Sequence, residues 1–383
     1  MPRILSISSS RADFGILLPV WRCLAEQPDC DLHIMLTGGH VMSNYQGSEL
    51  VPESANVHRG GADLGGADAQ KASAAIATIL RDAGAVMAQV SPDVVLIMGD
   101  RMDMLPAAVA ALPFNIPLAH IHGGEITEGA IDDRVRHALT KLSHIHFVSS
   151  AGAKQRLLAM GEEEKRIHVT GGPGLDTLLA APVMSRAEFL AAVGFPKDKD
   201  GALRLVTVHP ETNVANADAP LRAVLAALSE RDGPMLFTAP NSDPGGAAMR
   251  KTIEAFVASQ PHTRFIDTLG PKLYPNALRH AAVMVGNSSS GIIEAGLFGL
   301  PVIDIGDRQR GRERGSNVMH VANDPAAVTA ALDRLNPGTR FSETSLYGDG
   351  RSAPRIARLL LNLPARDALL RKAWPSVVLL ESR

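Results

Sequence analysis

Short apolar runs alternate with amphipathic stretches along most of the chain. A first set of runs covers residues 3–8, 31–36, 93–98, 116–122 and 144–148. A second set covers residues 203–208, 234–238, 264–266, 283–286 and 301–305. Helical periodicity lies between them, most clearly at residues 13–25, 68–90 and 215–231. Strands that alternate with helices form parallel sheets covered by helices on both faces, so the pattern predicts an α/β protein.

The division of the strands into two sets indicates two domains. A chain of 383 residues is long enough for two doubly wound, Rossmann-like domains. Glycine and proline interrupt the pattern at residues 171–182, so we expect a first domain at residues 1–175 and a second at 176–363. We expect residues 364–383 to form a helical tail that packs back on the first domain. Because ligands bind beyond the carboxyl ends of parallel strands, the two domains should face a central cleft.

The composition excludes several classes of partner. A formal net charge of -2 and an aromatic content of 4% offer neither a basic field nor many stacking surfaces, so we expect no nucleic-acid or membrane partner. The first residues read as a strand rather than a signal peptide, and no apolar run is long enough to span a bilayer, so we expect a cytoplasmic protein. Cys23 and Cys30 have no cysteine or histidine cluster around them, and we expect two small buried hydrophobes rather than a disulfide or a metal pair.

A run of small residues follows the predicted strand at 283–286 and opens a helix. Ser288, Ser289, Ser290 and Gly291 allow backbone N–H groups to approach an anion, and a helix N-terminus favours a diphosphate there. Glu294 follows one helical turn later, where its carboxylate suits a ribose diol. The same residues also suit a simple helix cap, with Glu294 facing the helix dipole.

Two arginines are further candidates for binding phosphate. Arg11 lies in the turn after the first predicted strand and offers a bidentate guanidinium, although Asp13 can cap the following helix and leave Arg11 in solvent. Arg308 begins a basic run at residues 308–314, after the strand at 301–305. Runs of charged residues usually face solvent, whereas a position at the carboxyl end of a strand favours contact with a ligand. The sequence supports these two interpretations of the run equally.

Three carboxylates end successive segments of the first domain. Asp100 ends one strand, Glu125 follows the next, and Asp132 begins the helix after that. Carboxylates that converge in one crevice raise each other's pKa, which suits removal of a proton from carbon. Each residue alone also suits a helix cap or an exposed turn, and Asp133 is an alternative to Asp132. In the second domain His209 ends a strand, where it can donate to a phosphate or transfer a proton.

These motifs occur in one order over nearly the whole chain, which resembles the hydrolysing UDP-N-acetylglucosamine 2-epimerases. Members of that family release free N-acetylmannosamine for sialic acid synthesis, and a similar branch acts on 2,4-diacetamido sugars for legionaminic acid. The matching segments are residues 10–15, 99–101, 120–132, 136–137, 172–176, 209–212, 240–243, 286–294 and 306–309.

The resemblance implies a fold like that of the two-domain GT-B glycosyltransferases and a mechanism without metal or redox cofactor. A base removes the C2 proton as UDP leaves anti, and water then adds syn to the 2-acetamidoglucal. Asp100, Glu125 and Asp132 match the family's acid–base positions, and we expect His209 to assist them. The expected nucleotide-binding residues are Arg11, Asn241, Ser288, Ser289, Ser290, Gly291, Glu294 and Arg308.

Two positions favour the hydrolysing branch of the family. The non-hydrolysing relatives carry a glutamate where this chain has His122 and an arginine where it has Pro210. We therefore expect a hydrolysing UDP-N-acetylglucosamine 2-epimerase, and a homodimer formed through the first domain. The alternatives are the same chemistry on a UDP- or GDP-linked 2,4-diacetamido-trideoxyhexose, a GT-B glycosyltransferase, and a sensor that binds a sugar nucleotide without turnover.

Overall fold

The computed structural model describes residues 1–41, 50–64, 68–127, 131–197, 199–211, 216–241, 243–336, 338–342 and 345–373. Several predicted positions lie outside the described residues: Glu128, Gly129 and Ala130, Thr212, Ser242, and residues 374–383 of the predicted tail.

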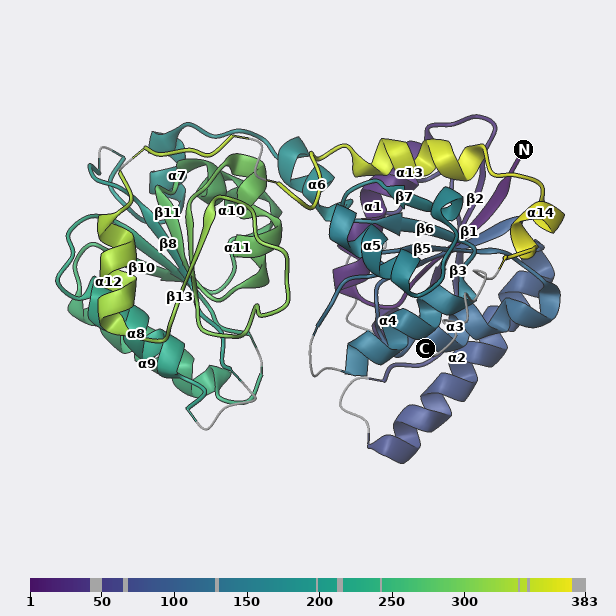
Figure 1. Cartoon of the computed structure of the whole chain (residues 1–383), viewed down its shortest axis with the longest axis horizontal. Helices are drawn as coiled ribbons and strands as arrows, with labels where there is room; N and C mark the ends of the chain where they lie inside the picture. The colour runs from purple at the N-terminus through teal and green to yellow at the C-terminus, as the bar shows by residue number, and fades with distance from the viewer. Residues whose placement is uncertain are drawn as a thin grey trace, which may run out of the picture. The chain divides into compact units, whose positions relative to one another are not determined.

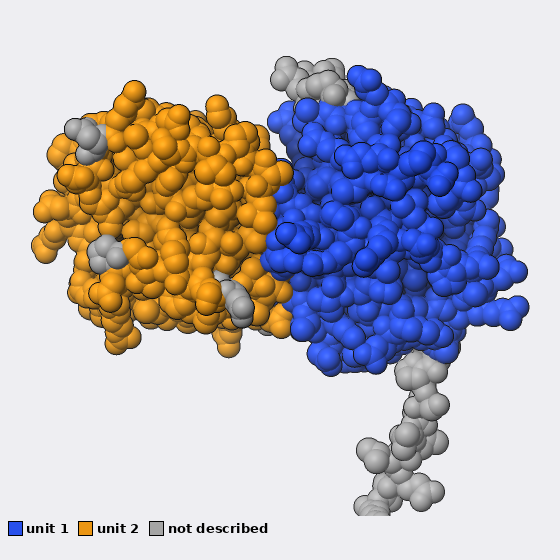
Figure 2. Space-filling view, turned by 90° about the horizontal axis from the view of Figure 1, so that it is seen from above, with its two compact units in different colours: residues 1–177, 348–383 blue, residues 178–347 orange. Residues whose placement is uncertain are grey.

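The chain forms two compact units (Figure 2). Unit 1 comprises Met1–Thr177 and Gly348–Arg383, and unit 2 comprises Leu178–Tyr347. The sequence interpretation assigned residues 348–363 to the second domain, whereas the structure places them in unit 1. The reason is tertiary packing, because the helix at residues 352–361 lies in the apolar cluster of the first sheet, which local periodicity does not encode.

Unit 1 is built on a parallel sheet with strand order β3-β2-β1-β4-β5-β6-β7. Its strands are β1 Arg3–Ser8, β2 Asp31–Leu36, β3 Asn56–Arg59, β4 Val94–Met98, β5 Leu118–Ile121, β6 Ile145–Val148 and β7 Ile167–Val169. Its helices are α1 Arg11–Ala25, α2 Ala69–Val90, α3 Met104–Ala110, α4 Ile131–Leu142, α5 Ala151–Ala159, α13 Ser352–Leu361 and α14 Arg366–Leu370. The strand order reverses between β1 and β4, which is the point where such sheets bind ligands.

Unit 2 repeats this arrangement with strand order β10-β9-β8-β11-β12-β13, and its strands are also parallel. The strands are β8 Arg204–Thr207, β9 Met235–Thr238, β10 Thr263–Ile266, β11 Val283–Gly286, β12 Val302–Ile305 and β13 Val318–Val321. The helices are α7 Arg186–Ala192, α8 Ala219–Leu228, α9 Gly246–Ser259, α10 Gly270–His280, α11 Ser289–Ile293 and α12 Pro325–Asp333, and the boundary between the units falls within α6 Gly174–Ala180. Here the order reverses between β8 and β11.

The central strands are buried and mainly apolar because both faces of each sheet are covered (Figure 1). In β1, Ile4 packs with α1 and α13, whereas Leu5 packs on the opposite face with α2 and α3. In unit 2, α8, α9 and α12 cover one face and α7 and α10 the other. Parallel strands buried in this way lose the alternation of polar and apolar residues, which explains the continuous runs in the sequence.

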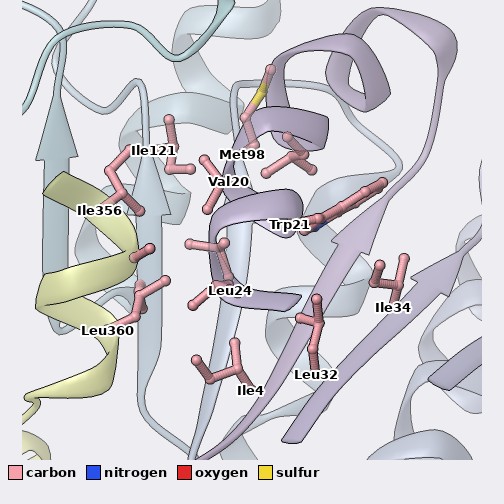
Figure 3. Packing of buried hydrophobic residues seen from close by; sticks show 14 of the residues in the cluster. Ile4, Val20, Trp21, Leu24, Leu32, Ile34, Met98, Ile121, Ile356 and Leu360 are labelled. Carbon is pink, nitrogen blue, oxygen red and sulfur yellow. The ribbon is translucent and has the colours of Figure 1, made fainter. Parts of the chain in front are cut away.

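Helix α13 joins unit 1 through its apolar face. Ile356 and Leu360 are fully or almost fully buried and lie in the same cluster as Leu24 of α1 (Figure 3). Asp176 fixes the start of the helix, since its carboxylate accepts hydrogen bonds from the backbone N–H groups of Ser352 at 3.0 Å and Ala353 at 2.7 Å. These contacts bring the end of the chain back to the first sheet.

Helix α14 also belongs to unit 1. Arg166, which precedes β7, donates to the carbonyl oxygens of Leu369 and Arg371, each at 2.7 Å. The described part of the predicted tail therefore packs on the first sheet's unit.

Two further features bear on the expectations from composition. Cys23 and Cys30 are free and only partly buried, and they pack against the apolar cluster of α1 and α13. In the described part of the chain, none of the helices has the length and apolar character needed to cross a bilayer.

Candidate functional site

The loop that carries Asp100 follows β4 and is held from the neighbouring strand. Gly99 adopts a left-handed conformation with φ of 77°, and its carbonyl accepts a hydrogen bond of 2.8 Å from Nε2 of His120. Burial lowers the pKa of His120 to about 3, so its ring is neutral at physiological pH. His120 is therefore a fixed donor that sets the position of the loop rather than a group that exchanges protons.

A tight turn after β5 aims Glu125 back toward the sheet. His122 and Gly124 both have positive φ, of 66° and 78°. A side chain at Gly124 would place its Cβ 2.5 Å from the carbonyl oxygen of Ala153, so only glycine fits there. Oε1 of Glu125 accepts hydrogen bonds from Nδ1 of His122 at 2.5 Å and from Oγ of Ser149 at 2.7 Å.

Arg136 of α4 draws the acidic loops of unit 1 together. Its side chain is 3% exposed and forms ion pairs with Asp100 and Asp133. Its Nη1 also donates to the backbone carbonyl of Glu125 at 2.9 Å, and its Nη2 donates to Oγ1 of Thr127 at 3.1 Å. One buried guanidinium therefore connects the loop after β4, the turn after β5 and the first turn of α4, as the strand order predicts for adjacent strands.

Asp132 and Asp133 have different surroundings in the structure. Asp133 forms contacts within the protein: its carboxylate accepts a hydrogen bond of 2.7 Å from the backbone N–H of Thr127 and forms an ion pair with Arg136. Asp132 is half-buried, and burial together with the negative charge of Asp100 raises the pKa of its carboxyl. A carboxyl that holds its proton more tightly is the better candidate for a general acid or base.

In unit 2 His209 is held as a neutral hydrogen-bond donor. Its Nδ1 accepts a hydrogen bond of 3.1 Å from the backbone N–H of Asn241, so the proton of the neutral ring lies on Nε2. Burial and the nearby charge of Arg308 lower the pKa of His209 to about 4. The side chain of Asn287 holds the His209 backbone from both sides, accepting from its N–H at 2.7 Å and donating to its carbonyl at 2.9 Å.

The serine run begins where β11 passes very close to β8. A Cβ on Gly286 would lie 1.8 Å from the carbonyl oxygen of Thr207, so this position requires glycine. Ser288 is the N-cap of α11 and accepts from the N–H of Ser290, as the capping interpretation predicts. Gly291 is buried with an ideal Cβ position 2.9 Å from Val302, so its lack of a side chain serves packing against β12.

Glu294 is not a solvent-exposed partner of the helix dipole. It is half-buried, and its Oε2 accepts a hydrogen bond of 2.7 Å from the hydroxyl of Tyr274 in α10. Burial raises the pKa of Glu294, and the hydrogen bond from Tyr274 opposes this shift. Tyr274 therefore fixes the carboxylate, a contact that the sequence did not suggest.

A cavity of about 390 Å³ opens within unit 2 beyond the carboxyl ends of β8, β9, β10 and β11. This is the point where the strand order reverses, and a volume of this size suits part of a nucleotide. The cavity is lined by Thr207, His209, Thr238, Ala239, Asp267, Thr268, Leu269, Gly270, Pro271, Tyr274, Ser288 and Ser290. The lining contains Ser288 and Ser290 of the predicted nucleotide-binding residues, together with His209. It also contains the segment at residues 267–271, which the sequence did not suggest.

Four other predicted nucleotide-binding residues are not among the residues that line this cavity. Arg11 is exposed at the first position of α1, and Asp13 closes a capping box with Ser10, as the alternative interpretation predicts. Asn241 donates from Nδ2 to Asp243 at 2.5 Å, and Arg308 lies 3.7 Å from the same carboxylate. Ser289 is the first residue of α11 and is half-buried.

Comparison with known proteins identifies the family. Residues 22–361 match the sequence profile of the UDP-N-acetylglucosamine 2-epimerases. The chain belongs to this family. Among the relatives of this epimerase, a UDP-N,N'-diacetylbacillosamine 2-epimerase (hydrolyzing) from Legionella pneumophila is 36% identical over 97% of this chain and 98% of its own. A UDP-N-acetylglucosamine 2-epimerase from Neisseria meningitidis is 32% identical over 94% of this chain and 96% of its own.

Solved structures confirm the predicted two-domain α/β fold of the epimerase. The crystal structure of UDP-GlcNAc 2-epimerase from Neisseria meningitidis bound to UDP-GlcNAc matches with a TM-score of 0.74 at 18% identity. The match covers 94% of this chain and all of the other.

Proposed function

We propose that this epimerase is a hydrolysing 2-epimerase whose substrate is a UDP-linked 2,4-diacetamido sugar, the diacetylbacillosamine type. From the sequence we expect UDP-N-acetylglucosamine as the substrate, with the diacetamido sugar as an alternative. The identity to the Legionella relative over almost the full length of both chains supports that alternative better. A nucleotide-sugar substrate is also supported by the ligand of the structural relative from Neisseria.

In the proposed complex unit 2 holds the nucleotide. The Nε2–H of His209 donates to the diphosphate, and because the ring has a low pKa it stays a neutral donor at physiological pH. Ser288 and Ser290 offer further donors in the same cavity. Glu294, held by Tyr274, accepts hydrogen bonds from the ribose hydroxyls. These groups hold the leaving group and do not exchange protons with the sugar.

The proposed proton transfers belong to the carboxylates of unit 1. In the first step a carboxylate takes the C2 proton while the C1–O bond to UDP breaks, and a C1–C2 double bond forms. In the second step the oxygen of water bonds to C1, a carboxyl gives a proton to C2, and a carboxylate takes one proton of the water, so that the other stays on the new C1 hydroxyl. The observation that carries this proposal is the convergence of Asp100 and the Glu125 loop on Arg136, with the raised pKa of Asp132 beside them.

The groups used in the two steps need not be the same. We propose that Asp100 serves both steps, and that Glu125 or Asp132 serves hydration. Asp100→Asn should then abolish all turnover, whereas Glu125→Gln or Asp132→Asn should still release some UDP and accumulate the 2,4-diacetamido glycal of the proposed substrate. Conversion of this synthetic glycal in the presence of UDP, followed by NMR, separates the two classes. Equal loss of both half-reactions in all three variants would contradict this division.

A panel of donors without acceptor tests the proposed function. UDP-N,N'-diacetylbacillosamine, its GDP counterpart and UDP-N-acetylglucosamine are incubated separately, with nucleotide release read by ³¹P NMR and the free sugar by ¹H NMR. We expect kcat/KM to be highest for the UDP-diacetamido sugar by about tenfold or more, the range that pocket contacts provide. Preference for UDP-N-acetylglucosamine would restore the original prediction. Absence of release from every donor would contradict hydrolysing epimerisation and favour a transferase or a sensor.

A further inference from the structure

His122 combines three features that stability alone does not require. It is a non-glycine residue in the left-handed region, with φ of 66°. Its Nδ1 forms a hydrogen bond of 2.5 Å to Glu125. Its Nε2 is buried and has no hydrogen-bond partner among the residues that the structure describes. Strained backbone and unpaired buried polar atoms concentrate at functional sites, because packing alone would remove them.

The geometry points to His122 as the positioning residue for Glu125 in the proposed reaction: its ring fixes the orientation of the carboxylate and retains a proton beside it. This inference rests on the proposed function and extends it to a residue that the sequence analysis used only to distinguish the two branches of the family. His122 acts through Glu125, and the structure assigns it no direct contact with the sugar.

Two donors fix the same oxygen of Glu125, and only one of them can change its charge. Ser149 directly follows β6 and donates a hydrogen bond of 2.7 Å from its neutral hydroxyl. His122 supplies its ring N–H at 2.5 Å. The backbone of His122 is held in place as well, because its N–H donates a hydrogen bond of 3.0 Å to the carbonyl oxygen of Phe147 in β6. The carboxylate is therefore clamped between a permanent donor and a donor that titrates.

Charged groups on every side of His122 bear on its proton. Burial disfavours the charged ring, and Arg136 of α4 acts in the same direction. Glu125 in the same turn and Asp100 after β4 favour the charged ring, and together they raise the pKa of His122. His120 of β5 is neutral and adds no opposing charge at physiological pH. His122 beside Glu125 therefore keeps its proton to a higher pH than an ordinary histidine does.

A matched pair of variants separates this role from backbone strain. His122→Asn keeps a side-chain N–H donor near the position of Nδ1, and asparagine tolerates positive φ. His122→Gly tolerates the same backbone without strain and removes the donor. Ser149→Ala removes the donor that does not titrate. UDP affinity by calorimetry checks that unit 2 is intact, and thermal melting checks that each variant is folded.

The expected result is a split between kcat and KM. His122→Gly should lower kcat about 10²-fold, the lower end for loss of an acid–base partner, while KM changes little. In the wild type we expect kcat to fall as pH rises through the raised pKa of His122. His122→Asn should retain most of kcat but should not show this fall. Ser149→Ala should lower kcat and keep that pH dependence. A wild-type kcat and pH profile in His122→Gly would overturn the inference, as would an unchanged pH profile in His122→Asn.

A spectroscopic measurement tests the pair without turnover. In protein labelled with ¹⁵N-histidine, we expect His122 to keep its proton on Nδ1 across neutral pH and to titrate above 6.5, the ordinary value for histidine. Glu125→Gln should move this titration to lower pH. A His122 that titrates identically in both proteins would overturn the inference. Failure of the wild type to release nucleotide from any donor would contradict only the proposed function, since the titration does not depend on catalysis.

Discussion

Replacing Arg136 by methionine should destabilise unit 1 by about 3 kcal/mol. The guanidinium is 3% exposed and its two carboxylate partners, Asp100 and Asp133, are 29% and 22% exposed. Removing one partner of a buried ion pair costs about 3–5 kcal/mol, because the remaining charge stays buried without compensation. Since both carboxylates retain some contact with solvent, we expect the low end of this range, and we expect turnover to fall because Asp100 loses its fixed position.

Urea unfolding followed by tryptophan fluorescence measures this change in one unit. Trp21 is buried in unit 1, and the sequence of residues 178–347 contains no tryptophan, so the signal reports unit 1. Lys154→Met is the matched control, because its ion pair with Glu164 is exposed and such pairs contribute about 0–1 kcal/mol. If Arg136→Met costs no more than this control, Arg136 does not hold the acidic loops, and our account of the site is wrong.

Two further predictions concern unit 2 and the pH dependence of stability. Glu294→Gln should weaken UDP binding by about 1.5–3 kcal/mol in calorimetry, the range for a hydrogen bond to a charged group, and Tyr274→Phe should weaken it less. Unchanged affinity in Glu294→Gln would contradict the proposed contact of Glu294 with the ribose. Because His120 has a folded pKa of about 3, this residue binds more protons in the unfolded chain below pH 6.5, so the contribution of His120 to stability should rise with pH up to about 6.5 and then level off. Between pH 7 and pH 5 this residue should account for about 2 kcal/mol of lost stability, and urea unfolding of His120→Asn should show a weaker pH dependence. An identical dependence in that variant would contradict the assignment.

The sequence predicts the buried strands well and the edge strands poorly. All ten predicted runs contain a strand. Nine of these strands lie inside a sheet and are mainly apolar because both of their faces are covered, whereas the tenth, β10, is an edge strand. The strands β3, β7 and β13 were not predicted, and all three lie at the edge of a sheet. Asn56–Arg59 of β3 is largely exposed and polar, so it has no apolar run to signal it.

The candidate site residues divide in a similar way. The sequence could predict that Asp100 and Glu125 lie at the same edge, because they follow strands that adjoin in a parallel sheet. Arg136 could not be recognised as the residue that joins them, since an arginine within an amphipathic helix normally faces solvent. Only the fold distinguishes Asp132 from Asp133, because adjacent residues of a helix differ in direction and not in chemistry. Tyr274 and the 267–271 segment reach the cavity from α10 and the loop after β10, and no motif in the sequence connects them with the serine run.

The most direct test of the account is the position of solvent hydrogen in the product. Elimination followed by hydration breaks the C2–H bond and forms it again from the medium. Turnover of UDP-N,N'-diacetylbacillosamine in D₂O should therefore give UDP and a free 2-epimer that carries one deuterium at C2, as read by ¹H NMR and mass spectrometry. Product that retains the original hydrogen at C2 would contradict the proposed mechanism.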